Sequence, residues 1–404
     1  MEMENIVVVG TGDYFWGLLR PTLKFMQNFG LVKVLKTVDI CEREEDKNAL
    51  PRNLEHIIRV FPNQSLNELL RDLRDYNPTV ILCHFNEFHT PDTANLASCD
   101  FKVMVEKPYA IDAEQFASLD ATTKKHSGSV SLLQYYLMMK SIPLLVLGGK
   151  VREESFYFNE NGVLKADGIL RDPRDLSGRF NDVIGKPKSI LVEILEGEGN
   201  YGRLEHRGQH LVDTSLGGGM IQDLGLHAVA PLFALQEYIG RIDRSFFVGS
   251  VSTAKCEEYA DMASKKYKLT DQQIGETYAD IGFETTSHVP VILRVGKYVL
   301  NQENRRRIVI VGSYGTIDYD LTNNKISLPY KNGDLILECP KTCEKYYPVI
   351  RAGLEQLKGN NLFYFDPIAV SLAAQEFILN VLRKSRLSES RIYSTGVNPE
   401  TIFT

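Results

Sequence analysis

The sequence has little of several features that would assign it to a particular class of protein. Its 404 residues include only six cysteines, too few for a disulfide scaffold, so we expect reduced thiols and a cytoplasmic protein. It has 46 basic residues against 52 acidic ones, and without a basic excess no nucleic-acid partner is expected. No apolar run approaches the roughly 18 residues of a membrane helix, so no membrane partner is expected. The acidic start, residues 1–4, lacks the basic and apolar regions of a signal peptide.

The sequence does have an apolar share of 43%, enough for a large core, and a length that predicts two or three domains. Residues 1–140 alternate short apolar runs with helical stretches, which is typical of an α/β domain with a parallel sheet between helices. Pro91 would suit the first turn of one helix, and Asp112 would cap the next. The expected strands are 5–9, 32–40, 79–83, 101–105 and 130–136.

The remainder of the chain, 141–404, shows strands and helices that no longer alternate regularly. Residues 150–182 are rich in charge, glycine and aspartate, and we interpret them as an irregular insertion outside the core. A run of three glycines, 217–219, precedes an apolar helix at about 220–238. This pattern predicts an α+β domain with a mainly antiparallel open sheet. Its expected strands are 189–195, 246–252, 289–300, 308–312 and 316–320, with a last helix at about 366–384.

A glycine-rich turn follows the first expected strand. Gly10, Thr11 and Gly12 come directly after an apolar β-branched run and before a helix, where backbone N–H groups can bind a pyrophosphate. This favours a dinucleotide-binding (Rossmann) domain, although a simple turn glycine is the alternative. The third glycine of the usual pattern is replaced by Phe15, and Gly17 would take its place only in a longer turn.

Asp39 strengthens the case for a dinucleotide. It lies at the end of the second expected strand, where a carboxylate can accept hydrogen bonds from both ribose hydroxyls. Since it would repel a 2′-phosphate, NAD is favoured as the cofactor, while the nearby Arg43 leaves NADP open. An ordinary strand-end carboxylate is the alternative interpretation.

Three residues have the chemistry of alcohol oxidation. Removing a hydride from a carbinol carbon requires a base for the hydroxyl proton, and the imidazole of His227 has a suitable pKa. Asp223 lies four residues earlier, so on a helix both would share one face. Lys107, at the carboxyl end of a strand, would stabilise the developing alkoxide. Alone, each of these residues is most often a surface or structural residue. Their joint occurrence favours catalysis, in which the Lys107 ammonium and the His227 imidazole would act on one carbon.

Two elements of the chain together resemble a known family. Glu106-Lys107-Pro108 is followed about 110 residues later by the stretch Gly217-Gly-Gly-Met-Ile-Gln-Asp-Leu-Gly-Leu-His227. In this order they resemble the glucose–fructose oxidoreductase / inositol dehydrogenase family of two-domain NAD(P)-dependent oxidoreductases, over nearly the whole chain. Three further matches are Asn86 with His89 (its Asn-x-x-His turn after the fourth strand), the strand end 134–136, and the Gly-x-x-Gly pair 312–315.

The resemblance implies an N-terminal Rossmann domain, 1–140, and a substrate-binding and oligomerisation domain, 141–404. It implies catalytic roles for Lys107, Asp223 and His227 and a cis Lys107–Pro108 bond beside the nicotinamide. The residues expected at the cofactor are Gly10, Thr11, Gly12, Asp39, Asn86, His89, Glu106 and Lys107, and Tyr136 is expected to bind substrate. The sequence departs from the family at Phe15, at Ala230, where an aspartate is common, and at the insertion 150–182, which suggests a substrate-covering loop or a subunit contact.

Other clusters carry weaker signals. His206 and His210 have the spacing of a helical zinc site, but Arg207 and Gly208 replace the acidic base and a helix former. We therefore expect no metal, and expect substrate contact by His206, Arg207 or His210. Residues 305–307 are three arginines, which we interpret as a solvated strand edge, with a phosphate contact as the alternative. Cys339 and Cys343 lack a second pair for a metal or redox site.

The predicted function is hydride transfer between NAD, or NADP, and a secondary hydroxyl or ketone of a sugar, cyclitol or activated sugar. One alternative is an NAD-dependent glycosidase that oxidises the sugar transiently and eliminates its substituent. Another is a sugar- or NAD-sensing regulator of the same fold without turnover. The open sheet face of the second domain favours a homodimer or homotetramer, because such a face needs covering.

Overall fold

The computed structural model describes residues 3–12, 14–41, 56–60, 65–152, 163–166, 178–197, 208–297, 304–328, 333–338, 346–387 and 390–393. The chain forms two compact units, which are described separately. The first comprises Met1–Gln134 and Cys339–Leu362, and the second comprises Tyr135–Glu338 and Phe363–Thr404. A late segment therefore returns to the first unit, which the single expected boundary after residue 140 did not anticipate.

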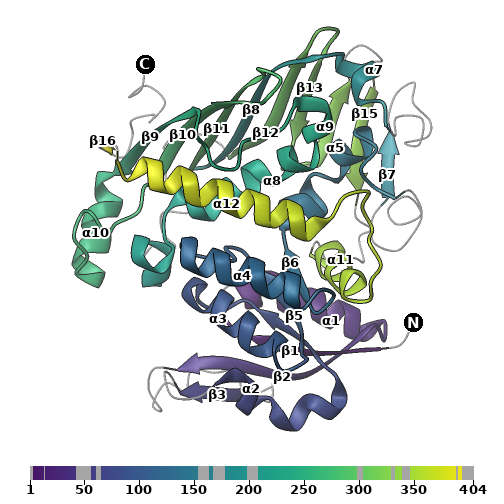
Figure 1. Cartoon of the computed structure of the whole chain (residues 1–404), viewed down its shortest axis with the longest axis vertical. Coiled ribbons are helices and arrows are strands. Elements are labelled where there is room, and N and C mark those ends of the chain that lie inside the picture. Colours follow the sequence, from purple (N-terminus) through teal and green to yellow (C-terminus); the bar gives the residue numbers. More distant parts are fainter. Residues whose placement is uncertain are drawn as a thin grey trace. The chain divides into compact units, whose positions relative to one another are not determined.

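The first unit is built on a six-stranded sheet with the order β3-β2-β1-β4-β5-β6, in which all neighbouring strands are parallel (Figure 1). This confirms the expected Rossmann domain. The order reverses between β1 and β4, which is where open α/β sheets bind ligands. The strands are β1 (Glu4–Val9), β2 (Val32–Cys41), β3 (His56–Val60), β4 (Thr79–Leu82), β5 (Lys102–Glu106) and β6 (Val130–Leu133).

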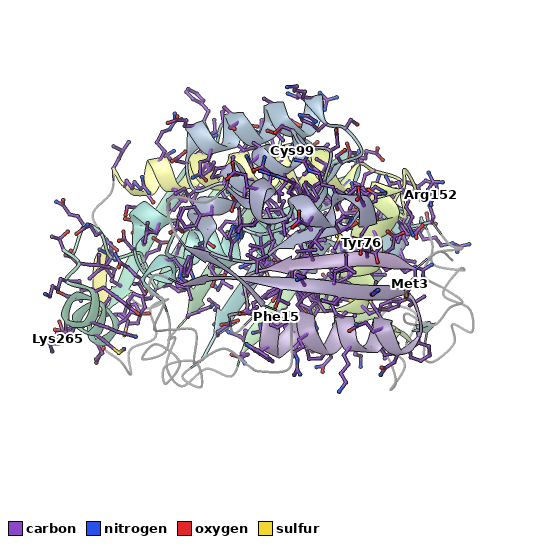
Figure 2. All side chains as sticks on the ribbon, turned by 90° about the horizontal axis from the view of Figure 1, so that it is seen from below. Met3, Phe15, Tyr76, Cys99, Arg152 and Lys265 are labelled. Atoms are coloured by element: carbon purple, nitrogen blue, oxygen red, sulfur yellow. The ribbon has the colours of Figure 1, made fainter. Side chains whose placement is uncertain are left out.

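Helices cover both faces of this sheet. In Figure 1, α3 and α4 lie on one face, while α1 packs against β2 and contacts α11 on the other. Figure 2 labels Met3, the residue before β1, and Phe15, the first residue of η1. The helical segments are η1 (Phe15–Leu19), α1 (Arg20–Asn28), α2 (Leu66–Leu69), η3 (Arg71–Tyr76), α3 (Asn86–Ala97), α4 (Ala113–Lys125) and α11 (Tyr347–Leu357).

Two helix starts test the expected capping signals. The Asp112 carboxylate accepts a hydrogen bond from the Gln115 N–H at 2.8 Å, so the cap of α4 is confirmed. The placement of Pro91 was wrong, because α3 begins five residues earlier at Asn86 and includes the proline in its interior.

Helix α11 is the part of the chain that returns to the first unit. A Cβ on Gly353 would lie 2.8 Å from side-chain atoms of Met104 and Leu133, so only glycine lets this helix lie so close to β5 and β6. Ser131 Oγ donates to Gln356 Oε1 at 2.7 Å. No motif in the sequence predicted this docking.

The second unit is built on a ten-stranded sheet with the order β16-β9-β10-β11-β8-β12-β13-β14-β15-β7. The pairs β8–β11 and β9–β16 are parallel and the other neighbours are antiparallel, which confirms the mainly antiparallel α+β domain. The strands are β7 (Val163–Ala166), β8 (Pro187–Glu196), β9 (Gly249–Cys256), β10 (Tyr278–Glu284), β11 (Pro290–Lys297), β12 (Arg305–Gly312), β13 (Thr316–Asp320), β14 (Lys325–Leu328), β15 (Gly333–Glu338) and β16 (Arg391–Tyr393).

Helices α8 and α12 pack together over one face of this sheet, with α12 running along it (Figure 1). Every residue of α8 is buried, and Phe233 of α8 meets Phe377 of α12 edge-to-face. The helical segments are η4 (Tyr136–Lys140), α5 (Ile142–Leu147), α7 (Phe180–Ile184), η7 (Gln209–Leu211), η8 (Thr214–Leu216), η9 (Ile221–Gly225), α8 (Leu226–Ala234), α9 (Gln236–Ile239), α10 (Glu257–Tyr267) and α12 (Pro367–Ser385).

Three expectations about these segments need correction. The strand expected at 130–136 ends at Leu133, because Tyr136 already begins the π-helical turn η4. The helix expected at 220–238 is divided into η9, α8 and α9. The insertion 150–182 is not wholly outside the core: β7 pairs with β15, and the Phe180 side chain is completely buried.

Candidate functional site

The glycine turn after β1 contains two glycines with different surroundings. Gly10 has a φ of +98°, and a Cβ there would lie 2.7 Å from the backbone nitrogen of His84, so the fold itself requires glycine. Around Gly12, no described atom lies within 4 Å of the position that a Cβ would occupy. The packing of the described residues does not explain Gly12, whereas close approach of a ligand to the backbone would.

The helix after this turn departs from the usual pattern, as the sequence indicated. Phe15 occupies the place of the third glycine and is buried, with its ring edge-on to Trp16. The Trp16 N–H donates to the Gly12 carbonyl at 3.2 Å, and η1 continues directly into α1. The third glycine of the usual pattern allows close packing of helix against strand, and Gly17 does not take this role, because no described atom lies within 4 Å of its Cβ position.

The carboxylate of Glu106, at the end of β5, is bound by two tyrosines. The Tyr14 hydroxyl donates to Oε1 at 2.5 Å, and the Tyr346 hydroxyl donates to the same oxygen. The Lys107 N–H donates to Oε2 at 3.1 Å. Burial raises the pKa of Glu106 to about 7, although the Tyr14 hydrogen bond and the Lys107 charge oppose this shift.

His89 connects α3 to the turn that follows Glu106. Its Nδ1 lies 2.7 Å from the Pro108 carbonyl oxygen, so Nδ1 carries the proton and donates it. Burial lowers the pKa of His89 to about 3, which keeps the imidazole neutral at physiological pH. The Lys107–Pro108 peptide is cis, as the resemblance implied. The structure thus brings Asn86, at the start of α3, and His89 together with Glu106 and Lys107 at the carboxyl ends of β4 and β5.

Asp39 lies near the end of β2, and β2 is the neighbour of β1. The Gly10 N–H donates to the Val38 carbonyl at 2.8 Å, so the backbone next to Asp39 is tied to the glycine turn. The side chain of Asp39 is outside the described part of the structure, and its contact with a ribose stays a prediction.

In the second unit, the glycine run 217–219 allows a carboxylate to cap the helical segment after it. Glu276 Oε1 accepts a hydrogen bond from the Ile221 N–H at 2.7 Å. Gly219 has a φ of +111°, and a Cβ there would lie 2.8 Å from the same oxygen. Only glycine at this position leaves space for Glu276, which fixes the start of η9 and so the position of Asp223.

His227 lies face to face with a tyrosine. Its ring and that of Tyr136 have centroids 4.4 Å apart and planes inclined by 28°. Both side chains are largely buried, and burial raises the pKa of Tyr136. The charges of Arg306, Glu196 and Asp223 also act on the Tyr136 hydroxyl, so this phenol lies within a polar cluster.

Asp223 belongs to a series of alternating charges. Its Oδ2 lies 2.5 Å from Lys297 Nζ, and the same ammonium lies 3.6 Å from Glu196 Oε2. The other oxygen of Glu196 accepts a hydrogen bond from Arg306 Nη2 at 2.6 Å. Sequence analysis did not select Lys297 or Glu196, and it considered Arg306 only as part of the arginine run. Each is a charged residue in a strand whose neighbours on the same face are apolar and buried.

The three arginines at 305–307 are not a solvated edge, so that interpretation was wrong. Strand β12 lies inside the sheet between β8 and β13, and both of its sides are paired. Arg307 Nε lies 2.6 Å from the buried Glu193 carboxylate, and Arg305 lies 3.5 Å from it. Arg306 points to the opposite face, toward Glu196, because side chains alternate along a strand.

Of the pair His206 and His210, only His210 belongs to the described residues. His210 lies in η7, half-buried, with its ring next to Gly208. Among the described residues, no three His, Cys, Asp or Glu side chains form a group able to hold a metal ion, and no helix has the length and apolarity needed to cross a bilayer. Outside the described residues lie Arg43, His206, Arg207, Cys339 and Cys343.

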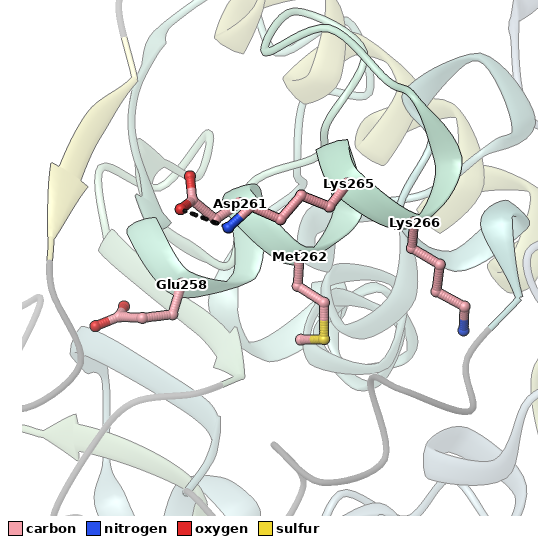
Figure 3. A pocket seen from close by; sticks show the side chains of 5 residues that line it. All are labelled: Glu258, Asp261, Met262, Lys265 and Lys266. Atoms are coloured by element: carbon pink, nitrogen blue, oxygen red, sulfur yellow. Dashed lines mark ion pairs between the residues drawn. The ribbon is translucent and has the colours of Figure 1, made fainter.

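A surface hollow lies beside α10. Figure 3 shows the five side chains that line it, with Lys265 paired to Asp261 at 3.6 Å on the same helix. All five residues come from one helix: Glu258, Asp261, Met262, Lys265 and Lys266. Their charged groups do not converge on one point, so we assign no chemistry to this hollow.

The fold of the chain is shared by solved structures of oxidoreductases. No protein-family model matches the chain, and no curated protein does either. The NAD complex of GenD2, from gentamicin A biosynthesis, is 15% identical with a TM-score of 0.63, covering 95% of each chain. D-galactose-1-dehydrogenase from Rhizobium etli is 15% identical with a TM-score of 0.62, covering 98% of this chain and 99% of its own.

A third similar structure is a 3-ketoreductase from Actinomadura kijaniata in complex with NADP. It is 14% identical, with a TM-score of 0.57, over 97% of this chain and 99% of its own. At these identities the likeness establishes the fold of both units. It is the two-domain fold that the sequence resemblance implied.

Proposed function

We propose that this chain, which has the fold of the sugar and cyclitol oxidoreductases, is an NAD(P)-dependent oxidoreductase of the glucose–fructose oxidoreductase / inositol dehydrogenase family. It would transfer a hydride between nicotinamide and a CH–OH carbon of a sugar, cyclitol or activated sugar. The observation that carries this proposal is the polar cluster around His227. A buried imidazole stacked on Tyr136, a phenol on which the charge of the ion-paired Asp223 acts, is suited to general base catalysis.

The open space at Gly12 supports cofactor binding. Gly10, Thr11 and Gly12 would hold the pyrophosphate by their backbone, and Asp39 would bind the ribose. Two of the similar structures contain NAD or NADP, and the acidic Asp39 makes NAD our first choice. When bound, the cofactor would supply the hydride acceptor or donor, chemistry that the side chains cannot provide.

The residues of the chain would then move the proton. In the direction of oxidation, His227 would take the proton of the reacting hydroxyl. Asp223 would orient the substrate or stabilise the imidazolium that forms. The ammonium of Lys107 would lower the pKa of the hydroxyl and stabilise the developing negative charge on oxygen. The Tyr136 hydroxyl and His210 would contact other parts of the substrate.

The test is a substrate panel with matched variants. Purified protein is incubated with NAD or NADP and sugars, cyclitols, sugar phosphates and nucleotide sugars, and reduced nicotinamide is measured. Lys107→Met and His227→Asn should each lower turnover at least about 100-fold while cofactor affinity is kept. The controls are Lys102→Met, at the other end of β5, and His288→Asn, on an exposed turn.

Three outcomes decide the proposal. Turnover with at least one substrate, lost in both site variants and kept in both controls, supports it. No reaction with any substrate, and no oxidation of NADH by the matching ketones, contradicts it. Cleavage of an aryl glycoside without net NADH would instead assign the chain to the NAD-dependent glycosidases.

A further inference from the structure

We propose that Lys297 is a positioning residue of the proposed reaction, and that its ammonium keeps Asp223 ionised beside Glu196 so that Asp223 can support proton uptake by His227. The inference rests on the proposed function for its catalytic meaning. Its structural content, one ammonium paired with Asp223 beside a second carboxylate, can be tested separately.

The geometry places Lys297 between the two acids. Its Nζ lies 2.5 Å from Asp223 Oδ2 and 3.6 Å from Glu196 Oε2. Glu196 and Lys297 are register partners at the ends of the parallel strands β8 and β11. The Lys297 N–H donates to the Thr277 carbonyl at 2.9 Å, which anchors the backbone at this point. The lysine therefore reaches Asp223 from a fixed position in the sheet.

The surroundings make this ammonium costly to bury. The Lys297 side chain is only 7% exposed, and the preceding residues on the same face of β11, Leu293 and Val295, are fully buried. A buried lysine is retained only when its charge is matched, and here two carboxylates match it. In return, each carboxylate gains a cation at short range in a poorly solvated place.

Without Lys297 the two acids would no longer share an ammonium. Glu196 already accepts a hydrogen bond from Arg306 at 2.6 Å and would keep this cation as its partner. Asp223 would lose the cation at 2.5 Å and would still face the negative charge of Glu196, so it would take up a proton closer to neutral pH. A protonated Asp223 cannot stabilise an imidazolium on His227.

The other charged and titratable groups around Asp223 have different roles. Tyr136 of η4 and His227 of α8 form the stacked pair. Glu276 caps the start of η9, and burial raises its pKa. Arg306 of β12 donates to Glu196. Lys297 thus provides an ammonium at hydrogen-bond distance from the Asp223 carboxylate.

The experiment is a cycle of variants at two positions. Lys297→Met removes the charge and keeps much of the volume, Glu196→Gln removes the competing acid, and the double variant does both. Lys150→Met is the matched control, because Lys150 is another buried lysine with a carboxylate partner, Glu237. For each protein, kcat and KM are measured against pH, and the Asp223 carboxyl is titrated by 13C NMR, with Asp223→Asn assigning the signal.

In Lys297→Met, we expect the Asp223 titration to move up by at least about one pH unit and kcat near neutral pH to fall about tenfold, with little change in KM. The double variant should move the titration back and recover part of kcat, since the repelling charge has gone. A merely structural ion pair would give no such recovery. Lys150→Met should lower thermal stability without moving the pH profile.

Two results would overturn the inference: an Asp223 titration unchanged in Lys297→Met, or a double variant no better than Lys297→Met. If no substrate is turned over by the wild type, the proposed function fails. The NMR titration still decides what Lys297 does, so the two failures can be told apart.

Discussion

Tyr136 covers one face of the His227 imidazole, with ring centroids 4.4 Å apart. The two residues are far apart in sequence, and Tyr136 begins a π-helical turn just after Gln134, the last residue of the first unit's N-terminal segment. The stack limits rotation of the imidazole and leaves the phenol hydroxyl in the polar cluster. Ring and hydroxyl therefore have separable roles.

Removal of the Tyr136 hydroxyl tests its role in substrate binding. In Tyr136→Phe the stack persists, so thermal stability should change little, whereas kcat/KM should fall about tenfold through the loss of one hydrogen bond. Tyr136→Ala should also lose the packing, at a cost of about 3–5 kcal/mol in the free energy of unfolding. Unchanged kcat/KM in Tyr136→Phe would show that the hydroxyl does not contact substrate.

The two glycines of the turn after β1 should respond differently to alanine. Gly10→Ala places a Cβ against the His84 backbone at a positive φ, so we expect a loss of stability of about 2 kcal/mol or more. Gly12→Ala meets no described atom, so stability should be kept while NAD affinity falls at least about tenfold. Calorimetry of unfolding and of NAD binding measures both effects. Equal cofactor affinity in Gly12→Ala and wild type would refute a close approach of the pyrophosphate to the Gly12 backbone.

Glu106 should make stability depend on pH. Its pKa is raised from 4.5 to about 7 in the folded state, so between these values the folded chain binds more protons than the unfolded one. The stability associated with this carboxyl is therefore present at low pH and is lost as the pH rises through this window.

Glu106→Gln removes this titration. The free energy of unfolding of Glu106→Gln minus that of the wild type should increase by about 2–3 kcal/mol as the pH rises from about 5 to about 8. Denaturant unfolding of both proteins at several pH values measures the difference. Glu114→Gln, at an exposed position in the first turn of α4, is the control and should show no such trend. If the difference in free energy of unfolding between Glu106→Gln and the wild type does not change with pH, the raised pKa of Glu106 is contradicted.

Much of the fold could be predicted because its signals are local. The β-branched run before Gly10 is completely buried in β1, as expected for a strand covered on both sides. The Asp112 cap is formed by a side chain three residues from its N–H partner. The turn at Glu106–Pro108 follows β5 directly, so its position at the carboxyl edge of the sheet depends only on the strand assignment.

The rest depends on contacts between distant positions. Tyr346 reaches Glu106 from 240 residues away, and no local pattern indicates that α11 returns to the first unit. The positions of Lys297 and Arg306 within their strands do indicate that each charge has a buried partner. Each continues an alternation of inward apolar side chains, Leu293 and Val295 in one strand and Ile308 in the other, so a charge at that position predicts a buried partner.

The most direct test of the central claim is transfer of a deuterium label. Substrate deuterated at the oxidised carbon is mixed with the protein and NAD in a single turnover, and the nicotinamide is analysed by mass spectrometry. The account predicts one deuterium in the NADH formed by the wild type, and at least about 100-fold slower formation in both Lys107→Met and His227→Asn. NADH without the label, or labelled NADH formed at the wild-type rate by either variant, would contradict it.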